Sequence, residues 1–147
     1  MEQRDYLLRE IEKMGAITNA IRQKIFGGKE NLAITLEEQI KATKGMLLSE
    51  ANFDLDKFLE LNVDESNEYI CSFEGFSVDN IELLAESISE IGFSNKCDNP
   101  HKYLEKALQL YELCNLKGKT YSLERETNIN TIKKAIHRVE KNEKSNN

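Results

Sequence analysis

Apolar residues recur at helical spacing along most of the chain, beginning close to its first residue. Between residues 3 and 26 the steps alternate between four and three, at Leu7, Ile11, Met14, Thr18, Ile21 and Ile25. This spacing places these side chains on one face of an α-helix, while charged residues fill the opposite face. The pattern predicts a helix over 3–26 that ends at Gly27-Gly28, because glycine adopts the left-handed conformation of a C-cap without steric cost.

Six further segments show the same periodicity, at residues 30–50, 55–61, 63–74, 78–91, 100–115 and 122–140. Most of them begin near a residue whose side-chain oxygen can cap first-turn amides, namely Thr35, Asp54, Asn62, Ser77 and Asn99. Thr35 with Glu38 matches a capping box, so the regular part of the second helix is expected to begin at residue 36. Gly92 stands where a glycine commonly ends a helix. Because no segment alternates like a strand, the sequence predicts an all-α fold of about seven helices.

The order and spacing of these segments predict stacked antiparallel helical hairpins. The glycine turn at 27–28 is short, so residues 1–50 are expected to form an N-terminal hairpin. The last three helices begin near residues 77, 100 and 122, a rhythm typical of helical-hairpin repeats. We therefore predict one helical domain over 1–140, followed by a disordered polar tail at 141–147.

Two segments resemble known families. Residues 5–14 (Asp-Tyr-Leu-Leu-Arg-Glu-Ile-Glu-Lys-Met) and 24–29 (Lys-Ile-Phe-Gly-Gly-Lys) resemble the start of a family of small bacterial all-helical proteins of unassigned function. Residues 103–116, with Ala107, Leu108 and Tyr111, resemble the second helix of a tetratricopeptide repeat (TPR). The resemblances imply that residues 51–140 are TPR-like and that the protein is a helical scaffold, and they carry over no catalytic residues.

Composition and charge disfavour some classes of fold and some kinds of binding partner. Seven glycines and one proline among 147 residues fall well below the usual share of roughly 12%, which disfavours turn-rich sandwiches and barrels. The net charge of −6 is uneven: residues 1–50 hold eight basic and eight acidic side chains, 51–100 two and twelve, and 101–147 ten and six. The acidic middle repels phosphate and favours a basic partner.

Three further features of the sequence concern nucleic-acid binding, membrane spanning and cellular location. The basic side chains Lys133, Lys134, Arg138, Lys141 and Lys144 form either a solvated helix end or a phosphate-binding surface. No apolar run approaches the roughly 20 residues that cross a bilayer. The first residues carry no apolar signal core, so a cytoplasmic location is expected.

Candidate catalytic and metal-binding residues are sparse. Cys97 and His101 have a Cys-x-x-x-His spacing, but a zinc site requires two further ligands and no Cys-x-x-Cys pair accompanies them. Glu82, Glu86 and Glu90 repeat at i,i+4, a pattern typical of a solvated helix face. We predict no catalytic, cofactor-binding or metal-binding residues and no cofactor.

The sequence therefore predicts a non-enzymatic protein–protein interaction or scaffold protein that holds a peptide or helix in a concave groove. The alternative is a nucleic-acid-binding regulator that uses the basic last helix. The N-terminal seam, which we define as Leu7, Ile11, Met14, Ile21 and Ile25, is the candidate contact surface. Two interpretations stay open: the seam packs within one copy, or part of it contacts a protein partner or a second copy in a homodimer.

Overall fold

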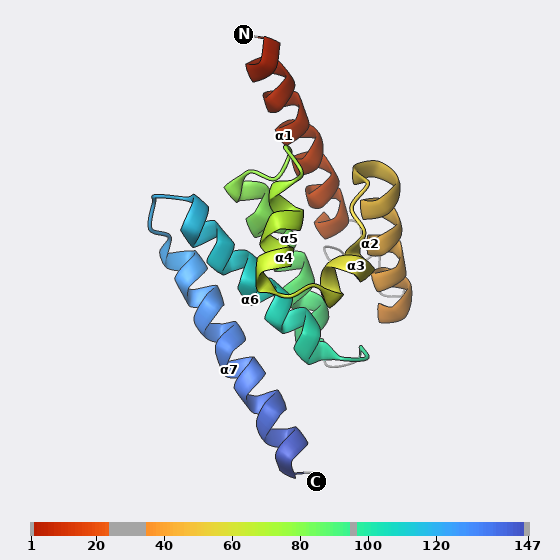
Figure 1. Ribbon diagram of the computed structural model, residues 1–147. Coiled ribbons are helices and arrows are strands. Elements are labelled where there is room, and N and C mark those ends of the chain that lie inside the picture. Colours follow the sequence, from red (N-terminus) through yellow and green to blue (C-terminus); the bar gives the residue numbers. More distant parts are fainter. Residues whose placement is uncertain (1, 24–34, 95–96, 146–147) are drawn as a thin grey trace.

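Seven helices and no strand make up the residues that the computed structural model describes, 2–23, 35–94 and 97–145 (Figure 1). The helices are α1 (Glu2–Ile21), α2 (Leu36–Ala51), α3 (Leu55–Glu60), α4 (Val63–Cys71), α5 (Val78–Phe93), α6 (Pro100–Lys117) and α7 (Leu123–Ser145). The predicted all-α fold is confirmed. Ile25 and the glycine turn at 27–28 lie outside the described residues. No helix in the described part of the chain is long and apolar enough to cross a membrane.

Side-chain caps begin four helices where the sequence predicts them. The side chains of Thr35, Asp54, Asn62 and Ser77 each accept a hydrogen bond from the backbone N–H three residues later. The predicted cap at Asn99 is wrong. Asn99 holds the N-cap position with a φ of 62°, but its side chain makes no capping hydrogen bond. Pro100 is the first helical residue, where its fixed φ suits the helix.

Four helices end later than their apolar periodicity predicts: α2 by one residue, α5 and α6 by two residues, and α7 by five residues. α5 continues through Phe93, so Gly92 is its penultimate residue, buried against Leu104, and Ser94 is the C-cap. α7 continues through Ser145, so residues 141–145 are helical where the sequence predicts a tail. The lysine and glutamate residues there have high intrinsic helix propensity, which sustains a helix after the apolar pattern stops.

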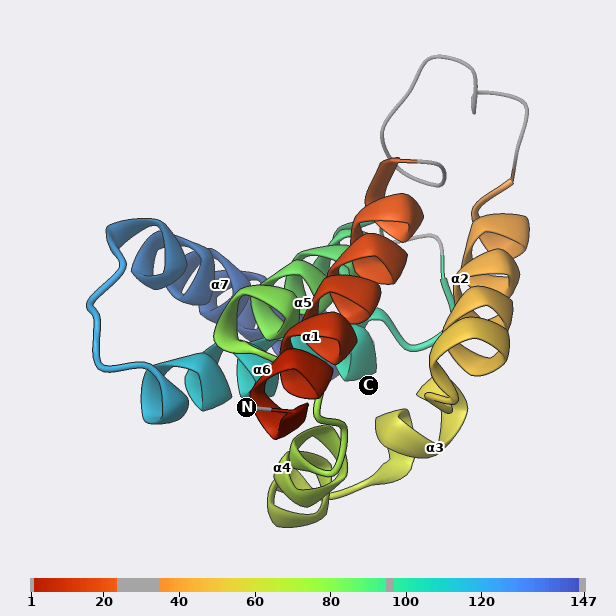
Figure 2. The ribbon, with the colours of Figure 1, turned by 90° about the horizontal axis from the view of Figure 1, so that it is seen from above.

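α5 lies at the centre of the fold, between α1 on one side and α6 on the other (Figures 1 and 2). α6 runs antiparallel to α5, and α7 runs antiparallel to α6 (Figure 1). The core residues of these helices are almost fully buried: Ile81, Leu84, Ala85, Ile88, Ile91, Leu104, Ala107, Leu110 and Tyr111. Burying each large aliphatic side chain stabilises the fold by about 1.5–3 kcal/mol. The antiparallel order agrees with the predicted hairpins, whereas a TPR-like arrangement stays a prediction.

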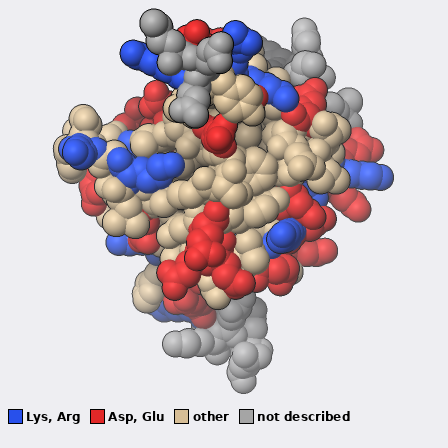
Figure 3. Space-filling view, turned by 45° about the horizontal axis from the view of Figure 1, so that its top comes forward, with Lys and Arg blue, Asp and Glu red and all other residues tan. Residues whose placement is uncertain are grey.

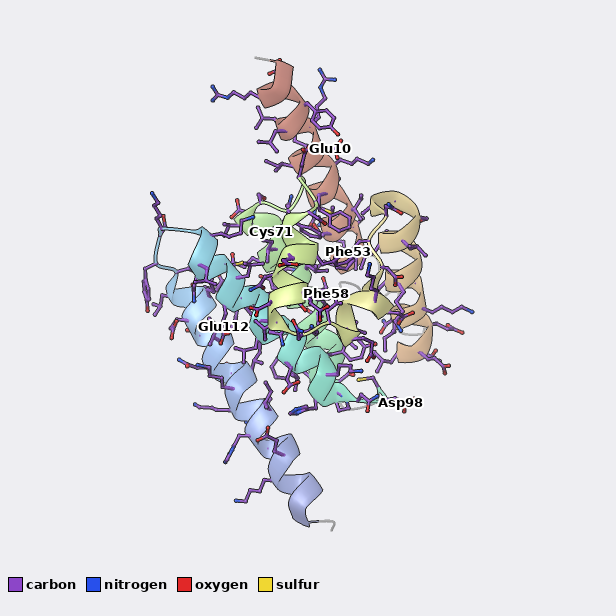
Figure 4. The ribbon with its side chains drawn as sticks, in the orientation of Figure 1. Glu10, Phe53, Phe58, Cys71, Asp98 and Glu112 are labelled. Carbon is purple, nitrogen blue, oxygen red and sulfur yellow. The ribbon has the colours of Figure 1, made fainter. Side chains whose placement is uncertain are left out.

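An aromatic cluster anchors α3, α4 and the connections beside them. Phe53 is fully buried at its centre, with the ring centroids of Phe58, Tyr69, Phe73 and Phe76 lying 5.2 to 5.6 Å from its own. Figure 4 shows Phe53 and Phe58 among the side chains between α2, α3 and the body. Such tilted aromatic pairs are worth about 0.5–1.5 kcal/mol each beyond the area that they bury.

Two glycines allow α1 to approach the rest of the fold closely. A Cβ atom at Gly75 would lie 2.6 Å from the carbonyl oxygen of Glu10, and one at Gly15 would lie 3.0 Å from Oδ1 of Asn80. The Nδ2 of Asn80 donates to the carbonyls of Ile11 and Gly75, each at 2.8 Å. These contacts fix α1 against α5 from Glu10 onward, while the turns before Glu10 extend beyond the body (Figure 1).

Candidate functional site

A pocket of about 310 Å³ lies where the end of α1 meets α5, α6 and α7. We call it the acidic pocket, and its lining residues are Arg22, Glu86, Ser89, Glu90, Phe93, Tyr111, Glu124, Asn128, Thr131 and Ile132. The i,i+4 spacing of Glu86 and Glu90 on α5 places both carboxylates on this side, because the apolar stripe of α5 faces the core. The sequence predicts a solvated face for these glutamates; Glu90 is exposed, as predicted, but Glu86 is half-buried.

Glu86 is the most confined carboxylate of the acidic pocket. Its Oε2 lies 3.0 Å from Nη1 of Arg22, yet this buried atom has no hydrogen-bond donor in line with it among the described residues. Burial raises the pKa of Glu86, and the nearby Glu124 and Glu82 add to this effect, while Arg22 opposes it. Folding therefore disfavours the charged form of Glu86.

The other groups of the pocket leave its negative charge largely unbalanced. Burial and the neighbouring Glu86 raise the pKa of Glu90, again against the opposing charge of Arg22. Glu124 adds a carboxylate from α7, so Arg22 faces three carboxylates. The C-terminal end of α5 at Phe93 contributes a partial negative charge from the helix dipole. The acidic pocket is thus suited to a cation.

The walls of the pocket add apolar surface to this charge. The Phe93 side chain is 41% exposed at the end of α5, whereas Ile132 is buried on α7. Tyr111 is buried, and its hydroxyl accepts a hydrogen bond from Nδ2 of Asn128 at 3.4 Å. An exposed aromatic ring beside carboxylates fits a lysine or arginine side chain, whose methylene groups pack on the ring while its charge meets the acids.

Glu82, one turn before Glu86, is held outside the acidic pocket by a buried arginine. Arg125 is 7% exposed, and its Nε donates to Oε1 of Glu82. Its Nη1 donates to Oδ1 of Asn115 at 3.0 Å. This ion pair balances Glu82 and joins α5 to α7, so it leaves Glu86, Glu90 and Glu124 as the carboxylates available to a ligand.

A second cavity of about 600 Å³ lies between α2, α3 and the start of α6, and it differs in charge balance. Lys44 pairs with Asp56 at 2.7 Å, and Lys102 pairs with Glu60. The acidic partner raises the pKa of Lys44. Because these lysines already have carboxylate partners, this cavity is a weaker candidate than the acidic pocket.

The structure separates the residues of the N-terminal seam. Met14 and Ile21 are buried, Ile11 is half-buried, and Leu7 is 42% exposed on the part of α1 that extends beyond the body. Ile25 lies outside the described residues. Met14 and Ile21 therefore pack within one copy, and Leu7 remains available for another contact.

The remaining sequence candidates lie apart from the acidic pocket. Lys133, Lys134 and Arg138 are exposed on the outer part of α7. The Nε2 of His101 lies 3.0 Å from Glu105, and no group of three or more potential metal ligands occurs in the described residues. Sequence reasoning identified the repeat of Glu82, Glu86 and Glu90, but not its meeting with Arg22, Phe93 and Glu124, which only the packing of α1, α5 and α7 creates. Searches of protein-family models, curated proteins and solved structures found no match to this chain.

Proposed function

We propose that the protein is a non-enzymatic interaction protein whose acidic pocket binds a basic side chain of a protein partner. The observation that carries this proposal is that three carboxylates, on Glu86, Glu90 and Glu124, line the pocket together with one basic side chain, that of Arg22, which pairs with Glu86 at 3.0 Å. A partner ammonium or guanidinium would supply the positive charge that these carboxylates lack.

The shape and chemistry of the pocket favour a side chain over a free ion. Phe93 and Ile132 offer apolar surface to the methylene groups of lysine or arginine, and Glu86, Glu90 and Glu124 receive the charged group. Binding by such a pocket weakens as salt rises, because the exposed part of the attraction is screened within about 8–10 Å. The partner is therefore a basic protein segment.

A lysine-rich peptide and the same peptide with every lysine acetylated test this proposal by isothermal titration calorimetry. Acetylation removes the charge and retains the length of the side chain. We expect the charged peptide to bind at low ionic strength and the acetylated peptide to bind at least tenfold more weakly, since charged hydrogen bonds contribute about 1.5–3 kcal/mol. Equal affinity of the two peptides would contradict the proposal.

A pair of charge-matched variants locates the binding site. The double variant Glu86→Gln/Glu90→Gln removes two carboxylates from the pocket, whereas Glu68→Gln/Glu112→Gln removes two exposed ones elsewhere. We expect roughly tenfold weaker binding from the first variant and a change of less than about twofold from the second. Similar losses from both would mean that net charge, and not the acidic pocket, attracts the peptide.

The alternative proposal, a nucleic-acid-binding regulator, rests on α7. Lys133, Lys134 and Arg138 are exposed, and the outer part of α7 extends away from the body (Figure 1). Nucleic acid would then bind at low salt, and replacing all three residues with glutamine would abolish a mobility shift. Replacing the exposed Lys41, Lys57 and Lys119 with glutamine is the matched control. A shift that survives the α7 variant, or no shift at low salt, would exclude this alternative.

A further inference from the structure

The first turns of α1 expose apolar side chains that their own chain does not cover. Every residue from Arg4 to Arg9 is exposed, and we call residues 4–9 the free end of α1. Within it, Tyr6 is 56%, Leu7 42% and Leu8 49% exposed. Figure 4 labels Glu10, where α1 reaches the connection between α4 and α5. The free end is about two turns long, enough to project beyond the body.

The apolar pattern of α1 does not stop where the body stops. Leu7 and Ile11 continue the spacing of Met14 and Ile21, which lie in the core. Leu8 widens the stripe by standing beside Leu7. A helix that carries its apolar stripe past its own domain presents a surface suited to another helix.

We propose that the free end of α1 pairs with the free end of a second copy, antiparallel across a twofold axis near Leu7 and Leu8. This contact uses a surface separate from the acidic pocket and does not rest on the proposed function. A twofold arrangement covers both free ends at once and closes after two copies, whereas a one-sided contact would leave one free end uncovered.

The charges of α1 favour the antiparallel orientation. With the axis at Leu8, Arg4 of each copy lies opposite Glu12 of the other copy. A parallel, in-register pair would instead place each of these residues beside its own copy, like charge against like charge. The helix dipoles are also favourably aligned when the two helices run in opposite directions.

The surface around the free end limits the strength of this dimer. In Figure 3 the N-terminal end of α1 is turned toward the viewer. The face seen there carries a broad area of uncharged residues bordered by acidic and basic side chains. The tip of each helix would reach the other copy near Glu74 and Gly75, which lie beside Glu10. Stable interfaces bury about 800 Å² per partner, more than two helical turns provide. We therefore expect a dimer that dissociates at micromolar concentrations.

Another exposed apolar patch, at the connection between α6 and α7, provides the matched control. Leu116, Tyr121 and Leu123 are 78%, 73% and 71% exposed. Substituting Leu116 and Leu123 with glutamate therefore adds the same charge to equally apolar positions away from α1.

Analytical ultracentrifugation over a wide range of protein concentrations tests the contact. We expect the unsubstituted protein to form a dimer, Leu7→Glu/Leu8→Glu to bind itself at least tenfold more weakly, and Leu116→Glu/Leu123→Glu to leave the dimer unchanged. Circular dichroism should show that all three proteins retain their helices, because the substituted side chains are exposed. A monomer at every concentration, an assembly larger than a dimer, or loss of the dimer in the control would overturn the proposal.

Disulfide trapping tests the orientation in a background that carries Cys71→Ser, Cys97→Ser and Cys114→Ser. In the antiparallel pair Leu8→Cys lies near its own counterpart and should form a covalent dimer under mild oxidation. Arg4→Cys should not cross-link with itself but should cross-link when mixed with Glu12→Cys. Self-cross-linking by Arg4→Cys as efficient as that by Leu8→Cys would indicate a parallel pair and overturn the proposed geometry.

Discussion

The junction of α3, α4 and α6 and the acidic pocket each contain an ionisable side chain withdrawn from water, but they satisfy it differently. At the junction, Lys106 is 3% exposed, and its Nζ donates to the carbonyl of Leu61, to Oγ of Ser66 and to Oε1 of Gln109. It also lies 4.9 Å from the ring centroid of Phe58. In the acidic pocket, the buried Oε2 of Glu86 has no aligned donor in the described part of the chain.

This difference indicates that the charge of Lys106 stabilises the fold, whereas the charge of Glu86 is a candidate for binding a ligand. Burial lowers the pKa of Lys106, against the opposing effect of Glu105 and Glu60, yet each hydrogen of its ammonium has an acceptor. Its role is therefore to hold the end of α3 and the start of α4 against α6. The acidic pocket holds three carboxylates, on Glu86, Glu90 and Glu124, beside the single cation of Arg22, so the positive charge of a ligand can balance the remainder.

The largest expected effect is on the stability of the junction. Lys106→Met keeps the length of the side chain but leaves the carbonyl of Leu61 and the hydroxyl of Ser66 without their donor. We expect the free energy of unfolding, measured by urea denaturation, to fall by about 2–4 kcal/mol, because unsatisfied buried polar groups cost about 1–3 kcal/mol each.

Lys102→Met is the matched control for this substitution. Lys102 lies one turn earlier on α6 and pairs at the surface with Glu60, whose side chain is 71% exposed. Exposed ion pairs contribute about 0–1 kcal/mol, so we expect a correspondingly small loss of stability. If the two substitutions had the same effect, the hydrogen bonds of Lys106 would not be what holds the junction.

The sequence predicts helix starts well, because capping depends on a few neighbouring residues. Thr35, Asp54, Asn62 and Ser77 cap as predicted. Asn99 differs in its backbone, which is left-handed with a φ of 62°, whereas the four residues that cap are extended. Asparagine tolerates this left-handed conformation, and in it the side chain makes no capping hydrogen bond.

The candidate sites were less predictable because they depend on how far one helix covers another. The i,i+4 repeat of Glu86 and Glu90 is visible in the sequence, but the partial burial of Glu86 follows from the positions of α1 and α7. Similarly, Leu7 lies seven residues before Met14, and Met14 lies seven residues before the buried Ile21, so the sequence pattern does not distinguish the three positions. Only the extent of the body decides that Met14 is buried and Leu7 is exposed.

The next prediction tests whether Glu86 is strained by its surroundings. Its pKa is raised, so its favourable contribution to stability is fully present below the unfolded value near 4.5 and is lost as pH rises through the folded value. Glu86→Gln should therefore stabilise the protein at neutral pH, by up to about 1 kcal/mol. This gain should disappear near pH 4.5, where the carboxyl of Glu86 is largely protonated in the folded protein.

Urea denaturation at the two pH values, with Glu112→Gln as the control, measures this effect. Glu112 is exposed on α6 outside the acidic pocket, so its substitution should change stability little at either pH. If Glu86→Gln destabilised the protein at neutral pH, its pairing with Arg22 would outweigh burial. The distinction from Lys106, whose charge is fully satisfied, would then no longer hold.

The smallest effect on stability, and the sharpest test of the comparison, comes from Arg22. Its side chain is 49% exposed and is the cation that lines the acidic pocket. Arg22→Gln should lower stability by less than about 0.5 kcal/mol, as expected for an exposed ion pair. The same change should tighten binding of the lysine-rich peptide, because the arginine competes with the partner's charge for Glu86 and Glu90. A structural ion pair would behave otherwise, with stability and binding both lost. If calorimetry showed weaker peptide binding by Arg22→Gln, Arg22 would be part of the binding surface rather than a competitor for its carboxylates.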